Sequence, residues 1–569
     1  MKRVLGRWAI LGALLSLVMW AAGCGPGGSA PGVDSGAAPS ATGNDINPVA
    51  RDRLEDGGTL RWPLTAVPNN FNFNEVDGLN INTYFVMGAL MPSVFVFDAA
   101  GAPVLRTDYV ESAELIATSP RQVVTYRINP SAIWSDGTPI TEADFEAQWR
   151  ALRSTNSGFE VASTRGYDKI QSVTKGRDDR EVVVTFGEPY ADWQGLFAPL
   201  YPASANFDPN IFNDGWKEKP LVTAGPFAFE RVDQAARTVT LVRNDRWWGR
   251  PAKLDRIVFR AIEPDAQIDA LANGEIDFID IGPDVDNLRR AEDTPGITVH
   301  RAGGSNFAHI TLNGASEALR DVRVRRALAM SIDRATITRA VIGPLGIPPT
   351  PLGNHILMPT QQGYQDNSGD IGRYDPEVAR ALLEEAGWRL EGAVRAKDGR
   401  QLTLRYVIRS QVTADRRAAE LVQGMLGEVG VKVDIEPVPG ADFFEDYLKR
   451  GNFDLTSFTW FGSVFPISAS RSLYSSPKPG PDGQLDVQQN YARVGSPELD
   501  RLFDRAIAEF DPMSAIETAN EIDRMIWQEV HSLPLYQVPD IVASKSSLAN
   551  YGAFGFASVI YEDLGFITR

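Results

Sequence analysis

From Gly57 onward, short runs rich in β-branched and aromatic residues alternate with longer segments that carry helix start and stop signals. The short runs predict strands, because Gly, Pro, Asn or Asp bounds each of them. Strands are expected at 59–65, 123–129, 181–187, 238–244, 254–262, 307–313, 402–408, 431–438 and 453–460.

The segments between these runs predict helices. Thr141 and Asp144 form a capping pair at the start of one of them. Asp375 followed by Pro376 is typical of a helix start, and Gly387 of the end of the same helix. Helices are expected at 142–153, 264–273, 321–341, 376–386, 414–428, 441–450, 497–509 and 514–530. The interspersed order indicates an α/β fold with mixed sheets, and no fixed-period repeat is found.

The first residues follow a different pattern. Lys2, Arg3 and Arg7 precede an apolar run of 13 residues, from Trp8 to Trp20. That run is short for a membrane span, which needs about 20 residues. Residues 1–23 are therefore interpreted as a signal peptide. No later segment of the sequence is long and apolar enough to cross a bilayer.

Cys24 is the only cysteine in the chain, and it follows Ala21, Ala22 and Gly23 directly. This order resembles the lipobox of bacterial lipoproteins, with Ala21 where leucine is usual, so Cys24 is expected to carry the lipid. The alternative is an ordinary secretory signal with a chance cysteine. Residues 24–49 are expected to form a flexible tether, because their Gly, Pro and Ser residues bury too little apolar area to offset the entropy of ordering.

Composition narrows the class of protein. The 569 residues suggest three or four folding units at about 150 residues each. A formal net charge of −17 argues against nucleic-acid binding, which favours a basic chain. One cysteine excludes internal disulfides and zinc sites built on several thiolates.

Motifs for catalysis and metal binding are absent from the sequence. It contains no GxSxG, HExxH or P-loop pattern, and its four histidines lack metal-ligand spacing. The acidic stretch 272–286 lacks the spacing of a calcium-binding loop and is interpreted as a helix end followed by a strand. No enzyme activity, metal or cofactor is therefore expected, although the many carboxylates leave a catalytic pair open.

Large aromatic residues follow the strand expected at 453–460. Trp460, Phe461 and Phe465 straddle Gly462 and Pro466 in SFTWFGSVFPIS. Rings at the rim of a cleft would make apolar pockets for variable side chains. The alternative is a buried core strand with a turn.

Seven segments, in order and with matching spacing, resemble the oligopeptide- and dipeptide-binding proteins of bacterial ABC importers, extracellular solute-binding protein family 5. The resemblance covers roughly residues 55–545. The segments are WSDGTPITEADF (134–145), TAGPFAFERV (223–232), LVRNDRWWGRPAKLDRIVFRAI (241–262), LANGEIDF (271–278), DVRVRRALAMSIDRATI (321–337), YDPEVARALLEEAGW (374–388) and GNFDLTSFTWFG (451–462).

The resemblance implies a two-lobed periplasmic-binding-protein fold of type II with an extra domain on the first lobe. Lobe I is expected at 50–98, 221–312 and 531–569, the extra domain at 99–220, and lobe II at 313–530.

Two chain crossings between the lobes are implied as well. FAHITLNG (307–314) and SLPLYQVPDI (532–541) are expected to form them. An extended segment can bend at a few dihedral angles while the lobes remain rigid, so these two segments would form the hinge.

Ligand-binding residues are carried over from the family by position. The loop after the strand at 453–460 lines the ligand channel of the family, where an extended peptide pairs with the loop backbone. The residues implied are Trp460, Phe461, Gly462 and Ser463 from this loop, Asp77, Gly78 and Leu79 from lobe I, and Asp280 and Asn306. For the polar residues, a turn or a solvated surface is the alternative.

Ser463 departs from the family pattern, in which an aspartate pairs with the free amino terminus of the peptide. A buried ammonium without a carboxylate partner costs several kcal/mol. Either another acid, such as Asp77, supplies the charge, or the ligand has no free amino terminus there.

The sequence therefore predicts a monomeric, lipid-anchored solute-binding subunit on the outer face of the cell membrane. Its expected partners are oligopeptides and the permease and ATPase subunits of an ABC importer. A carbohydrate or another non-peptide solute is the alternative ligand, and a secreted hydrolase is the third and least favoured interpretation.

Overall fold

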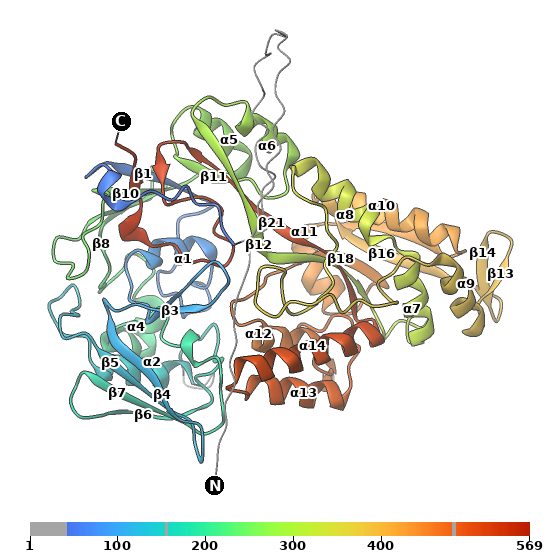
Figure 1. Ribbon diagram of the computed structural model, residues 1–569, viewed down its shortest axis with the longest axis horizontal. Coiled ribbons are helices and arrows are strands. Elements are labelled where there is room, and N and C mark those ends of the chain that lie inside the picture. Colours follow the sequence, from blue (N-terminus) through green and yellow to red (C-terminus); the bar gives the residue numbers. More distant parts are fainter. Residues whose placement is uncertain (1–42, 154–157, 481–484, 569) are drawn as a thin grey trace, which may run out of the picture. The chain divides into compact units, whose positions relative to one another are not determined.

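The computed structural model describes residues 43–153, 158–480 and 485–568 (Figure 1). The predicted signal peptide, Cys24 and most of the predicted tether lie outside these residues. Among the described helices, none combines the length and apolar character required of a membrane span.

A four-stranded sheet is built around Trp62. Parallel pairing joins β1 to β10, and the remaining neighbours are antiparallel. Trp62 is fully buried and packs within 5.7 Å of the rings of Phe278, Tyr551 and Tyr561. The strands in spatial order are β1 (Thr59–Leu64), β10 (Arg256–Ala261), β9 (Thr238–Arg243) and β8 (Phe227–Asp233).

A second, antiparallel four-stranded sheet comes from the first half of the chain. Helix α2 (Glu142–Leu152) accompanies this sheet, and Thr141 is its N-cap. The backbone N–H of Thr141 donates to Asp144 Oδ2 at 2.8 Å, so the predicted capping box is confirmed. The strands in spatial order are β4 (Val110–Ala117), β5 (Val123–Ile128), β7 (Glu181–Phe186) and β6 (Ile170–Lys175).

A six-stranded mixed sheet contains the two longest strands, β12 and β21, which run antiparallel to each other (Figure 1). The register shifts between Gly303 and Phe307 of β12. On one side of this shift β11 pairs with β21, and on the other side β18 pairs with β12. The strands in spatial order are β11 (Phe278–Asp280), β21 (Ser532–Lys545), β12 (Ile297–Leu312), β18 (Leu455–Trp460), β16 (Thr403–Arg409) and β17 (Lys432–Val438).

Short strands and helices complete the described fold. The remaining strands are β2 (Phe95–Phe97), β3 (Pro103–Leu105), β13 (Arg389–Glu391), β14 (Val394–Lys397), β15 (Arg400–Gln401), β19 (Lys478–Pro479), β20 (Leu485–Asp486), β22 (Leu548–Ala549) and β23 (Gly565–Phe566). The other helices are α1 (Ile81–Gly88), α3 (Ala203–Asn206), α4 (Pro209–Asp214), α5 (Pro264–Ala272), α6 (Val285–Glu292), α7 (Val322–Ser331), α8 (Arg334–Ile342), α9 (Pro376–Glu385), α10 (Thr413–Glu428), α11 (Gly440–Asp442), α12 (Pro466–Tyr474), α13 (Pro497–Ile507) and α14 (Pro512–Glu529). Single turns are η1 (Arg51–Arg53), η2 (Trp193–Gly195), η3 (Gly343–Leu345), η4 (Phe443–Leu448) and η5 (Tyr561–Asp563).

Two predicted helices differ from the structure. The helix expected at 321–341 is divided into α7 and α8, because Ile332 is extended and Asp333 caps a new helix by accepting from Thr336 N at 3.0 Å. The helix expected at 441–450 consists of the short α11 and the π-helical turn η4.

Two strand predictions also need correction. β12 begins at Ile297, ten residues before the expected 307. The segment 532–541, predicted only as an extended crossing, lies within β21 and pairs with β12 on one side.

Candidate functional site

A pocket of about 250 Å³ lies where β18 ends. Four of the residues predicted to bind ligand, Trp460, Phe461, Gly462 and Ser463, all line it. Leu455 to Phe458 are buried in the sheet, whereas Thr459 and Trp460 are partly exposed. The strand therefore carries the chain from the core to the pocket wall.

Trp460 is held by other rings. It stacks on His309 at 5.8 Å and on Tyr491 at 5.7 Å between centroids. Phe458 contacts it edge-on at 4.8 Å. Burial lowers the pKa of His309 to about 3, so this imidazole is neutral at physiological pH. Trp460 is therefore a fixed wall that supports both the pocket and the fold.

Phe461 and Gly462 differ sharply in their surroundings. The side chain of Phe461 is 83% exposed, although it is a large apolar ring. A Cβ atom added at Gly462 would lie 1.9 Å from the carbonyl oxygen of Ser305. Glycine is therefore required here by the protein's own backbone.

The pocket is polar without being acidic. Gln361 Nε2 donates to the Ser463 carbonyl at 3.1 Å, and Ser463 Oγ accepts from Phe465 N at 3.0 Å. Arg165 lines the pocket, and its side chain forms no hydrogen bond or ion pair with any described residue. None of the lining residues is Asp or Glu. The pocket therefore presents one cation and no carboxylate.

The other predicted ligand residues lie outside this pocket. Asn306 lies in the register shift of β12, where its Oδ1 accepts from Ser305 Oγ at 3.2 Å. Asp280 ends β11, and its side chain is exposed.

The segment from Asp77 to Leu79 forms a turn organised by Glu75. One carboxylate oxygen of Glu75 accepts from Asp77 N at 2.9 Å and from Gly78 N at 3.1 Å. Asp77 is exposed, Gly78 is buried, and Leu79 is 50% exposed. Burial raises the pKa of Glu75, while these two amides oppose the rise.

A buried histidine–aspartate contact supports another wall of the pocket. Asp523 Oδ1 accepts from the His355 backbone at 2.8 Å and lies 2.7 Å from His355 Nδ1. Both side chains are inaccessible to solvent. Ile356 and Met358, one and three residues after His355, line the pocket, so this contact helps to fix their position.

Several pocket residues were missed by the sequence analysis. They come from β12, α12 and several loops far apart in the chain, and no local pattern distinguishes them. These residues are Arg165, Phe307, Ile356, Met358, Gln361, Pro466, Ala469, Ser470, Leu473 and Gln489.

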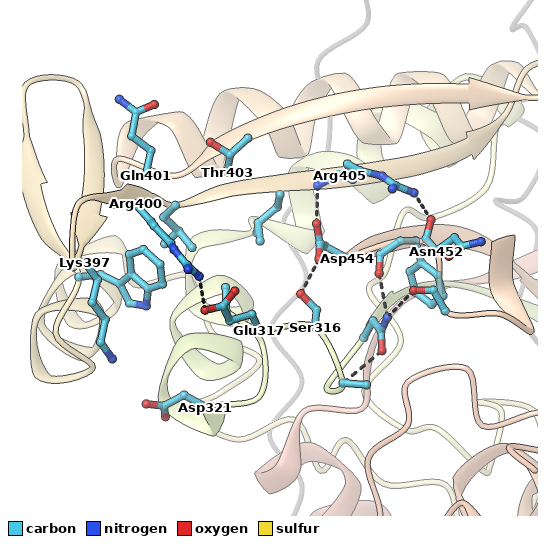
Figure 2. A pocket seen from close by; sticks show the side chains of 18 of the residues that line it. Ser316, Glu317, Asp321, Lys397, Arg400, Gln401, Thr403, Arg405, Asn452 and Asp454 are labelled. Atoms are coloured by element: carbon cyan, nitrogen blue, oxygen red, sulfur yellow. Dashed lines mark hydrogen bonds and ion pairs between the residues drawn. The ribbon is translucent and has the colours of Figure 1, made fainter. Parts of the chain in front are cut away.

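A larger groove of about 910 Å³ lies elsewhere, along the exposed start of β16 (Figure 2). Most of its charges are already paired within the protein. Arg400 contacts Glu317 at 2.7 Å, and Asp454 accepts from Ser316 and from Arg405 N. We therefore place the candidate site at the smaller pocket. There the Arg165 side chain has no hydrogen-bond or ion-pair partner among the described residues, and the ring of Phe461 is exposed.

No group of three or more His, Cys, Asp or Glu residues suited to a metal ion occurs in the part of the chain that the structure describes. The site is thus a cavity of aromatic, amide, hydroxyl and guanidinium groups. Such groups can hold and orient a solute, and no nucleophile–base pair is apparent among the lining residues.

The mixed sheets and the long β12–β21 pair define a type II periplasmic-binding-protein fold. The chain belongs to family 5 of the bacterial extracellular solute-binding proteins. The model of the middle region of this family matches residues 113–482. Members of this family are solute-binding proteins that act outside the cytoplasm.

Known proteins are similar to this chain, in sequence or in structure, over nearly its whole length. The oligopeptide-binding protein OppA of Mycobacterium tuberculosis H37Rv is 42% identical over 563 residues, covering 98% of this chain and 93% of OppA. The solved structure of the periplasmic EDTA-binding protein EppA is 28% identical, covers 94% of this chain and all of its own, and has a TM-score of 0.82. Bacillus subtilis AppA, an oligopeptide-binding protein solved with a nonapeptide, matches with a TM-score of 0.69 at 19% identity, covering 91% of this chain and all of AppA.

Proposed function

We propose that this protein captures oligopeptides and delivers them to the permease of an ABC importer. The observation that carries the proposal is the pocket at the end of β18, in a chain 42% identical to OppA over nearly its full length. Trp460 would wall the ligand, and the exposed ring of Phe461 would cover it.

The backbone beside these rings supports binding of an extended chain. β18 ends its pairing with β12 at Trp460. Phe461 and Gly462 have no backbone hydrogen-bond partner among the described residues. Their free N–H and C=O groups can pair with a peptide as an added strand, which satisfies peptide amides whatever the side chains are.

The test of the proposed function is direct binding. The mature protein is mixed with a peptide library and, separately, with EDTA and with oligosaccharides, and the retained species are identified by native mass spectrometry. Retention of intact peptides supports the proposal, whereas retention of an oligosaccharide or of EDTA alone rejects it. Release of cleaved peptides would instead indicate a hydrolase.

We also propose that β12 and β21 form the hinge between lobe I (50–98, 221–312 and 531–569, with the extra domain 99–220) and lobe II (313–530). The register shift between Gly303 and Phe307 supports this proposal, because a local break in pairing concentrates bending at few dihedrals.

Closure about this hinge should be visible by small-angle X-ray scattering. A saturating peptide is expected to reduce the radius of gyration, because the ligand would contact both lobes. A ligand-saturated sample with an unchanged radius would contradict hinge closure and leave the binding proposal intact.

The predicted lipid on Cys24 would anchor the protein to the outer face of the cell membrane. The basic start, short apolar run and Ala-Ala-Gly-Cys order support this proposal. Two acyl chains hold a protein stably, whereas one gives marginal binding.

Replacing Cys24 by alanine (Cys24→Ala) should therefore stall processing or release the protein from the membrane fraction. Fractionation and immunoblotting of cells expressing each form measure this. Normal cleavage and unchanged membrane association of the variant would contradict lipidation at Cys24.

A further inference from the structure

Two carboxylates lie on one face of the six-stranded sheet, outside the pocket described above. Asp280 of β11 pairs in register with Val542 of β21, and Asp540 lies two positions from Val542 on the same strand. Side chains two positions apart share a face, so Asp280 and Asp540 are diagonal neighbours. Such neighbours have Cα atoms about 7–8 Å apart, with Cβ atoms somewhat closer.

No positive charge compensates this pair. Asp540 Oδ2 accepts from Gly555 N and Asp280 Oδ1 from Gly282 N, each at 3.0 Å. Among the described residues, no Lys, Arg or His contributes to the pKa shift of either carboxylate. Burial raises the pKa of Asp540 to about 7, and the charge of Asp280 adds to the rise. The pKa of Asp280 is raised as well, because surrounding protein atoms partly desolvate its carboxylate even though solvent reaches the side chain.

A largely buried tyrosine lies against the same face of the sheet. The side chain of Tyr551 is 6% exposed, and its ring lies 4.0 Å from that of Phe278, which shares a face of β11 with Asp280. Burial raises the pKa of Tyr551, and the charges of Tyr561, Asp280 and Asp540 raise it further, so both carboxylates act on this hydroxyl electrostatically. No hydrogen bond to a described residue contributes to this pKa shift.

The pair lies near the loop that carries Phe461 and Gly462. Asp540 is opposite Ala302 on β12, and Ser305, three positions further on, contacts Gly462. Three residues of extended chain span about 10 Å. The pocket at the loop holds Arg165 and no carboxylate, whereas the Asp280–Asp540 pair is purely acidic. A solute lying along this stretch would meet a cation at one place and two carboxylates at the other.

We propose that Asp280, Asp540 and the Tyr551 hydroxyl form a subsite for an ammonium group of the bound solute. The inference rests on the proposed function, and it specifies the chemistry of the ligand. An ammonium has three N–H donors, which matches two carboxylates and one hydroxyl oxygen. A divalent cation would need more oxygen ligands than this cluster offers. The α-amino terminus of a peptide and the side chain of lysine share this chemistry.

Binding of an ammonium here must displace the proton that Asp540 holds near neutral pH. Affinity should therefore fall as the pH is lowered through about 7, by at most tenfold per pH unit for one proton. The titratable group that acts on Asp540 is Asp280, and Asp540 in turn acts on Tyr551; no described basic group opposes these effects.

The test is calorimetric titration of the mature protein with three matched peptides: one with a free amino terminus and no lysine, its N-acetylated form, and an N-acetylated form with one lysine. Asp540→Asn should weaken binding of an ammonium-bearing peptide by about 10- to 100-fold, because a hydrogen bond to a charged group is lost. It should leave the acetylated, lysine-free peptide unaffected and abolish proton release. The two ammonium-bearing peptides show whether the subsite takes the amino terminus, a lysine or both.

Asp286→Asn is the matched control, because Asp286 is an exposed acid on α6 and belongs to no predicted ligand segment. It should change none of these affinities. Asp540→Asn should not destabilise the fold above pH 7, because a carboxylate whose pKa is raised on folding costs stability once it is ionised.

The outcomes separate the two proposals. If all three peptides bind equally and Asp540→Asn changes nothing, the ammonium subsite is wrong and peptide binding stands. If Asp77→Asn, in place of Asp540→Asn, weakens the free-amine peptide, the subsite lies at Asp77 and this inference is overturned. If none of the three peptides binds, the proposed function fails, and the subsite fails with it.

Discussion

Replacing Gly462 by valine should both destabilise the protein and abolish tight solute binding. The first atom of any side chain at this position would lie 1.9 Å from the Ser305 carbonyl oxygen. Ser305 cannot retreat freely, because Phe307, two residues later, pairs with Trp460 in the sheet. The variant must therefore displace the loop that follows β18 or break this end of the pairing.

We expect Gly462→Val to lower the free energy of unfolding by about 1–3 kcal/mol, the usual cost of overpacking. Peptide affinity should fall by at least about 2 kcal/mol, the threshold of a binding hot spot, because Trp460, Phe461 and Ser463 would move together. Chemical denaturation and calorimetric titration measure the two effects.

Phe461→Ala is the control in the same loop. Its ring is 83% exposed, so removal should change stability by no more than about 0.5 kcal/mol. It should still weaken peptide binding if the ligand covers the ring. A Gly462→Val protein with normal stability and affinity would show that the loop does not form the site.

Replacing Asp523 by alanine should give the largest loss of stability. Its Oδ1 accepts from His355 N at 2.8 Å, and its Oδ2 accepts from Asn367 Nδ2 at 2.8 Å. Asp523 and His355 are inaccessible to solvent, so the substitution leaves buried donors without partners. We expect a loss of about 3–5 kcal/mol, the cost of breaking a buried polar pair.

Asp504→Ala is the matched control for this prediction. Asp504 accepts from Arg471 at 2.6 Å, but its side chain is 60% exposed. An exposed ion pair contributes about 0–1 kcal/mol, so this variant should unfold almost like the natural protein. Urea unfolding curves of the two variants compare them directly. Equal, small losses would mean that Asp523 does not fix the segment at His355.

Local signals in the sequence located the elements whose determinants are local, whereas β4, β6, β8 and α12 were missed. Thr141 with Asp144 and Asp375 with Pro376 mark helix starts by contacts within one turn, and both are confirmed. The helix at 321–341 was predicted as one piece because the sequence around Asp333 is compatible both with a continuous helix and with a new helix that begins after an Asp N-cap. Only the extended backbone of Ile332 distinguishes the two.

Long-range pairing was harder to predict. The extra length of β12 depends on pairing with β21, more than two hundred positions away. The sequence located the loop from Trp460 to Ser463, which the structure places in one pocket. It could not show why position 462 requires glycine, because the contact with Ser305 is tertiary.

The positions of the charged side chains of Arg165 and Asp540 were the least predictable. Arg165 lies in a loop without periodicity, and only the fold brings it to the pocket. Asp540 offered one signal, an acid inside an otherwise apolar strand, VPDIVAS. The proposed role of Asp540 depends on Asp280 lying on the neighbouring strand, and the sequence alone does not show that these strands pair.

The most direct test of the account is a competition measured by native mass spectrometry on the mature protein. A peptide library, EDTA and oligosaccharides are supplied together, and the retained species are identified. The account predicts an intact peptide in complex with the protein and a melting temperature that rises with peptide concentration, since the ligand binds only the folded state. Retention of EDTA or an oligosaccharide in place of any peptide would contradict it.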